Sequence, residues 1–239
     1  MEKLENRFEY IENVYDVDND YWKLKAKYLL EKFDKLGDSI STLKSIKVKN
    51  KDIYEQLFSY LLYNNQIEEA ETINLDFLNN DQYNSVSILE AREDYRKALD
   101  KVREIKNSSD NEYDLNLNVV ESFLLLKCNE FKQALSFLQK CLQASNYTEP
   151  IFLVNYYIAN EKIKGTNKPE KIKEKLLNSL KKHSDIIDVA AYALMKDEKN
   201  AYNKLKEVIQ SNYSYKYSIK NWIVFEDLFK KDKFKELLS

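Results

Sequence analysis

The sequence predicts an all-α protein built of antiparallel helix pairs. Its 239 residues include two glycines and two prolines, too few for a turn-rich β protein. Apolar residues recur at steps of three and four, the spacing of one helix face. Polar turns recur as well, and each is followed by a small residue that would let two helices approach closely. These small residues are Ala70, Ala98, Ala134 and Ala201.

The clearest turn is Asn129-Glu130-Phe131-Lys132-Gln133-Ala134, followed by an amphipathic helix. This stretch resembles the turn and second-helix start of a tetratricopeptide repeat, a helix–turn–helix unit of about 34 residues. The same organisation recurs at 64–70 and at 93–99. The resemblance implies a right-handed superhelical solenoid of about six helix pairs, filling one domain over residues 1–239. It also implies a concave face that binds other proteins.

In the N-terminal half, helices are expected over 4–15, 21–36, 38–46 and 52–63, followed by one from Ile67. The acidic break at 16–20 supplies an N-cap to the second of these helices. Gly37 is expected to be the C-cap of that helix, and Asp38 the N-cap of the next. A short helix around Val86 and Leu89 then precedes the turn at 93–99.

In the C-terminal half, Pro150 is expected to open a helix that runs through Ile163, because proline is tolerated in a first turn. A connection at 165–169 leads to a helix that carries Leu176 and Leu180. A further pair covers 190–194 and 200–209. Residues 219–239 resemble the segment that closes a group of tetratricopeptide repeats, since the last repeat exposes an apolar face that must be covered. The expected lid residues are Trp222, Phe225, Leu228, Phe229, Phe234 and Leu237.

The formal net charge is −2, which predicts no general attraction to nucleic acids or membranes. The charge is unevenly distributed along the chain. The stretch from Asp52 to Asp94 contains ten carboxylates and one basic residue. The stretch from Glu161 to Lys182 contains eight lysines and three glutamates. The plain interpretation of such runs is a solvated helix face.

The sequence contains few groups suited to catalysis or to cofactor binding. Gly37 and Gly165 stand alone, so no glycine-rich phosphate loop can be formed, and no cofactor or metal is expected. His183, the only histidine, has no catalytic or metal-binding partner nearby and is expected at the surface. Cys128 and Cys141 are expected to be unpaired thiols. Because nucleophile, metal and cofactor signatures are missing, a non-enzymatic protein is expected, and an enzyme is the last of the alternatives. With neither a secretory signal nor a membrane span visible, the protein is expected in the cytoplasm.

The resemblance places candidate partner-binding residues on the inner face of the first helix of each pair. They are Asp52, Glu55, Ser59 and Tyr63, then Tyr83, Ser87 and Glu90, then Asn116, Phe123 and Lys127. By the resemblance, repeats that hold a C-terminal carboxylate carry lysine, asparagine and arginine at such sites, and Glu55 and Ser59 depart from that pattern. An acidic groove with tyrosines instead favours a basic or amphipathic segment of a partner protein.

A scaffold or adaptor that binds proteins or peptides is the favoured function. One alternative is a regulatory module that senses a peptide. Another is nucleic-acid binding through the lysine-rich C-terminal half, which salt would weaken steeply.

Overall fold

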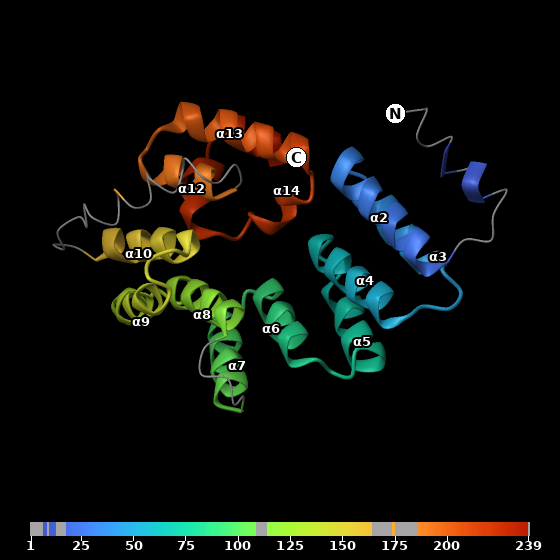
Figure 1. Cartoon of the computed structure of the whole chain (residues 1–239), viewed down its shortest axis with the longest axis horizontal. Coiled ribbons are helices and arrows are strands. Elements are labelled where there is room, and N and C mark those ends of the chain that lie inside the picture. The colour runs from blue at the N-terminus through green and yellow to red at the C-terminus, as the bar shows by residue number, and fades with distance from the viewer. Residues whose placement is uncertain are drawn as a thin grey trace. The chain divides into compact units, whose positions relative to one another are not determined.

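The computed structural model describes residues 7, 8, 10–12, 18–108, 114–163, 174 and 186–238. Within these ranges helices alternate with short connections and no β-strand occurs, which confirms the all-α prediction (Figure 1). The connection at 165–169, the helix after it and His183 lie outside the described residues, as does most of the helix expected over 4–15.

The helices form two compact units, residues 1–92 with 211–214 and residues 93–210 with 215–239. The division falls in the turn between helices α6 and α7. The organisation as a single domain over residues 1–239 stays a prediction.

In the first unit each helix packs against the next one along the chain, and α2 also contacts α4. This is the contact pattern of stacked helix hairpins, in which α2 and α4 are the first helices of successive pairs. The helices are α2 (Asn19–Phe33), α3 (Leu36–Ser45), α4 (Lys51–Tyr63), α5 (Ile67–Phe77) and α6 (Gln82–Ala91).

The second unit repeats this sequential packing from α7 to α10. Helix α10 contacts both α8 and α12, so these three first helices touch one another in order. The elements are α7 (Tyr95–Ser108), α8 (Leu115–Lys127), α9 (Phe131–Ala144), α10 (Pro150–Lys162), α12 (Ile186–Leu194), α13 (Glu198–Ser211), α14 (Tyr215–Ser218), η1 (Ile223–Phe225), α15 (Glu226–Phe229) and α16 (Asp232–Leu238).

One turn design recurs along the chain. In the α8–α9 turn, Asn129 adopts a left-handed backbone with φ of 60°, and the N–H of Glu130 donates to the carbonyl of Leu125 at 2.9 Å. Five residues after Asn129, Ala134 is fully buried. The same interval separates a left-handed residue from a fully buried small residue in four other turns: Asp34 and Ser39, Asn65 and Ala70, Glu93 and Ala98, Lys196 and Ala201.

The four alanines expected from the sequence therefore share one structural role. Each is 0% exposed near the start of its helix. At Ala70 and Ala134 that helix packs against the preceding one, α4 and α8 respectively, so a side chain larger than a methyl group would push those two helices apart. The burial expected for the four alanines is confirmed, while the repeat register stays a prediction. Ser39 is an additional member that the alanine pattern did not reveal.

Two cap predictions in the first unit were wrong. Helix α2 ends at Phe33, and Asp34 takes the left-handed C-cap position predicted for Gly37. Gly37 instead lies in the first turn of α3, with Asp38 beside it. Asp38 is thus not the N-cap. Its carboxylate lies in the first turn of α3, where it interacts favourably with the helix dipole. The cap expected from the acidic break is confirmed, because Asp18 accepts a hydrogen bond from the N–H of Tyr21 at 2.9 Å.

The C-terminal segment, described over residues 219–238, belongs to the second unit and packs against its helices. Phe225 and Phe234 are 0% exposed, and Leu228 is buried. Element η1 lies against α10 and α12, while Phe234 makes an edge-to-face contact with Tyr202 of α13, at 5.5 Å between ring centroids. Three of the six expected lid residues are thus buried. The other three, Trp222, Phe229 and Leu237, are partly exposed.

Candidate partner-binding surfaces

A groove between α2 and α4 collects four of the residues proposed from the sequence. Its volume is about 370 Å³, and its lining includes Asp52, Glu55, Ser59 and Tyr63. The side chain of Asn50 caps α4 by accepting a hydrogen bond from the N–H of Ile53 at 3.0 Å. With the helix started there, steps of three and four residues bring the four side chains onto one face.

Helix α2 forms the opposite wall, which the sequence analysis did not identify. Lys23, Lys27 and Glu31 line the groove from this side, each four residues from the next. That spacing was visible in the sequence as one helix face. What the sequence alone could not indicate was that this face of α2 lies against α4.

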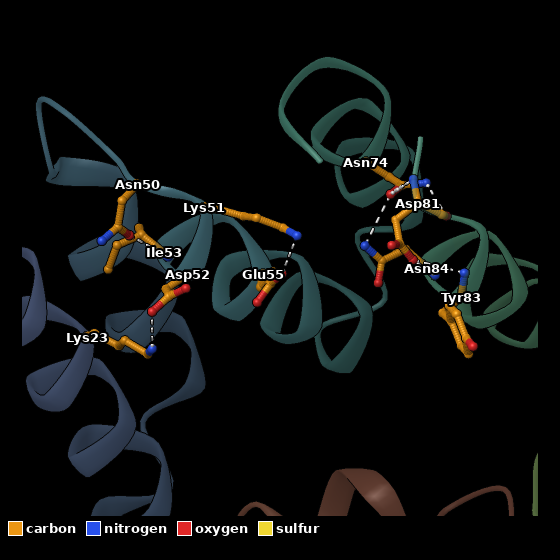
Figure 2. Close-up of polar contacts among 10 residues, drawn as sticks. All are labelled: Lys23, Asn50, Lys51, Asp52, Ile53, Glu55, Asn74, Asp81, Tyr83 and Asn84. Carbon is orange, nitrogen blue, oxygen red and sulfur yellow. Dashed lines mark hydrogen bonds and ion pairs between the residues drawn. The ribbon is translucent and has the colours of Figure 1, made fainter. Parts of the chain in front are cut away.

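The carboxylates at the groove mouth are paired with lysines. Lys23 Nζ lies 3.1 Å from a carboxylate oxygen of Asp52, and Lys51 Nζ lies 3.5 Å from one of Glu55 (Figure 2). All four side chains are more than a third exposed, so each ion pair contributes little stability. A cation brought by a partner could therefore replace either lysine at small cost.

Tyrosines and one glutamine supply the inner part of the groove. The rings of Tyr60 and Tyr63 stack with centroids 6.2 Å apart, and Gln56 Nε2 donates to the Tyr60 hydroxyl at 2.8 Å. Burial raises the pKa of Tyr60 to about 12 and also raises that of Tyr63, so both phenols are neutral. Gln56 Oε1 is buried without a hydrogen-bond partner among the described residues and can accept a bond from a ligand.

The three candidates on α6 do not line this groove. The start of α6 is set by Asp81, which caps it, and by the buried amide of Asn74, which accepts bonds from Asp81 N and Asn84 Nδ2 at 3.1 Å each (Figure 2). Tyr83 follows this cap and is 48% exposed. The Ser87 hydroxyl donates back to the carbonyl of Tyr83 at 3.4 Å.

Glu90, at the C-terminal end of α6, carries less charge than the sequence analysis assumed. Burial raises the pKa of its carboxyl group to about 7. At neutral pH the group is therefore protonated about half of the time. Its contribution to an acidic surface is correspondingly weaker than that of Asp52 or Glu55.

Other carboxylates of the acidic run also have basic partners. Lys44 Nζ lies 2.7 Å from Glu69, and Arg92 makes two hydrogen bonds to Glu71, at 2.6 and 3.1 Å. Lys44 comes from α3, outside the run. The part of the run in the first unit, residues 52–92, is therefore less negative in the folded chain than its eight carboxylates suggest.

In the second unit, Phe123 and Lys127 are brought together on α8. Lys127 Nζ lies 5.8 Å from the ring centroid of Phe123 and 5.5 Å from that of Tyr95 on α7. It also lies 3.4 Å from a carboxylate oxygen of Glu226 in the C-terminal segment. Asn116 is exposed two turns earlier on the same helix and does not join this cluster.

Other kinds of site are not apparent in the described ranges. There, no group of three or more His, Cys, Asp or Glu side chains is placed to hold a metal ion. Cys128 and Cys141 are free thiols, and burial raises the pKa of Cys141 to about 11. No helix of the described chain is both long and apolar enough to cross a membrane. The lysine-rich stretch 161–182 lies almost wholly outside these ranges.

No model of a known protein family matches the chain, and a search of curated proteins finds no similar sequence. The resemblance to tetratricopeptide repeats therefore stays a prediction that rests on the residues quoted above.

Proposed function

We propose that this chain is a non-enzymatic scaffold of the tetratricopeptide-repeat type, with right-handed stacking of its helix pairs. Its role is to hold a basic or amphipathic segment of a partner protein in the groove between α2 and α4. One observation carries this proposal: Asp52, Glu55, Ser59 and Tyr63, proposed from the sequence as one binding surface, line a single groove.

The groove offers three kinds of contact to a cationic side chain. Asp52 and Glu55 provide carboxylates whose lysine partners are exposed and replaceable. Tyr60 and Tyr63 provide ring faces for cation–π contact, and Gln56 Oε1 provides a buried acceptor for an N–H donor. Because Lys23 and Lys27 also line the groove, binding is expected to be of modest affinity and sensitive to salt.

The test uses the full chain and a fluorescently labelled synthetic peptide, an amphipathic helix with arginine and lysine on its polar face. A peptide of the same pattern with glutamate in place of the basic residues is the control. We expect fluorescence anisotropy to show binding of the basic peptide only. The Asp52→Lys/Glu55→Lys variant should bind it at least tenfold more weakly, a loss of about 1.4 kcal/mol.

A matched control variant is available on α5. Glu68 is an exposed carboxylate that does not line the groove, so Glu68→Lys should change the affinity less than twofold. Undiminished binding by the Asp52→Lys/Glu55→Lys variant would place the site elsewhere. Failure of the basic peptide to bind the wild-type chain would contradict the predicted partner class.

A further inference from the structure

The C-terminal segment is held against α8 and α10 of the second unit by specific polar contacts. Trp222 Nε1 donates a 3.0 Å hydrogen bond to Oδ1 of Asn155 on α10. Glu226 reaches the end of α8, where it pairs with Lys127 at 3.4 Å. Between these two contacts, Phe225 is fully buried and η1 packs against α10 and α12.

The acceptor for Trp222 is oriented by a second hydrogen bond of the Asn155 side chain. The Ser122 hydroxyl donates to the carbonyl of Val119 at 2.7 Å, so its oxygen is left to accept from Asn155 Nδ2 at 2.9 Å. That bond directs Oδ1 of Asn155 toward Trp222, whose indole N–H can only donate. Asn155 is 1% exposed, so an oxygen left without a donor would be costly.

The cation that meets Glu226 is also held in place. Lys127 lies over the rings of Tyr95 and Phe123, and its side chain is 13% exposed. Because the Lys127 ammonium group is largely shielded from water, pairing with a carboxylate is more favourable than leaving it unpaired. Asn155 Oδ1 accepts from an indole N–H, and Lys127 Nζ pairs with a carboxylate. Together they fit a segment with tryptophan followed four residues later by glutamate.

The C-terminal segment leaves a pocket between itself and the helices that it covers. A pocket of about 240 Å³ remains beside it, with Ile158 and Leu194 on the helix side and Ile223 and Leu228 on the segment side. The elements of the segment are short, from three to seven residues each. Incomplete packing and short helices lower the free energy needed to open it locally.

We propose that the α8–α10 surface is a recognition site for an aromatic–acidic segment, which residues 222–226 occupy as an internal competitor. The occupant in a complex is a segment of a partner protein with tryptophan followed four residues later by glutamate. A tethered segment has an effective concentration in the millimolar range, so a free segment binds well only after the internal one is weakened.

The test uses the full chain and a labelled peptide that copies residues 219–231. The Trp222→Phe/Glu226→Gln variant keeps a smaller aromatic ring but removes the indole donor and the charge from the internal segment. We expect the peptide to bind this variant at least tenfold more tightly than the wild-type chain. A control peptide with the same two substitutions should bind the variant at least tenfold more weakly than the copied peptide.

Equal affinity of the peptide for both chains would overturn the proposal, as would equal binding of the two peptides. Hydrogen exchange of residues 219–238 provides the second measurement. The peptide should speed exchange there in the Trp222→Phe/Glu226→Gln variant, because the internal segment is displaced. Peptide binding without such a change would show that it binds elsewhere, which also overturns the proposal.

Discussion

Trp222 and Asn155, 67 positions apart in the sequence, are joined by a hydrogen bond of 3.0 Å that fastens the C-terminal segment to α10. Trp222→Phe retains an aromatic ring, a smaller one, and leaves Oδ1 of Asn155 without its donor. We expect it to lower the free energy of unfolding by about 1–2 kcal/mol in urea titrations. Trp22→Phe on α2 makes the same change of ring and leaves a phenyl ring under Lys25, so it should cost less than about 0.5 kcal/mol. Equal effects at the two tryptophans would contradict a specific role for this bond.

A second prediction concerns the close helix contact at Ala134, which is fully buried. Ala134→Leu should destabilise the chain by about 1–3 kcal/mol, because overpacking forces α8 and α9 apart. Gln133→Leu introduces the same side chain at the exposed neighbouring position and should change stability by less than about 0.5 kcal/mol. Similar urea midpoints for the two variants would show that the register is wrong.

A third prediction concerns the left-handed residue in the same turn. Asn129 has φ of 60°, a conformation that asparagine and glycine tolerate and β-branched residues do not. Asn129→Val should therefore cost about 1–2 kcal/mol, while Asn129→Gly should stay within about 0.5 kcal/mol of the wild type. Thermal unfolding followed by circular dichroism separates the two, and a tolerated valine would argue against this backbone conformation.

A fourth prediction follows from Glu90, whose pKa is raised from 4.5 to about 7 by burial. Between these values the unfolded chain has lost the proton while the folded chain retains it. The free energy of unfolding should therefore fall as pH rises from about 4.5 to about 7, and this contribution should then level off. Glu90→Gln should remove this component and be more stable than the wild type at pH 8 by about 1–3 kcal/mol. At pH 4 the two proteins should differ little, and parallel pH profiles would contradict the raised pKa.

A fifth prediction concerns the thiols. Burial raises the pKa of both cysteines, to about 11 for Cys141, so little thiolate is present at pH 8. Ellman's reagent should modify Cys141 only after denaturant is added, and Cys128, which is partly exposed, should react first. Mass spectrometry of the labelled peptides assigns the order. Rapid modification of Cys141 in the folded chain would contradict its burial.

The local features of this fold were predictable because local chemistry determines them. A polar turn followed by a small residue is a short-range pattern, and Ala70, Ala98, Ala134 and Ala201 take the same role wherever it occurs. The prediction of Gly37 as the C-cap was wrong, although helix capping is also local. Aspartate and asparagine tolerate the left-handed conformation, so the only glycine nearby was not needed.

The features of the candidate sites that depend on long-range packing could not be predicted. Lys23 pairs with Asp52 across two helices, and the α2 wall of the groove emerges only when α2 and α4 are placed together. The same holds for Asn155 and Trp222. Their bond depends on where the C-terminal segment returns to the helices, which no periodicity of the sequence specifies.

Binding of a partner segment in the groove between α2 and α4 would leave a hydrogen-exchange footprint on these two helices. The full chain is compared with and without a saturating amount of the basic amphipathic peptide. We predict slower exchange in residues 19–33 and 51–63, with α9 unchanged as the internal reference. Protection confined to helices other than α2 and α4 would contradict the claim.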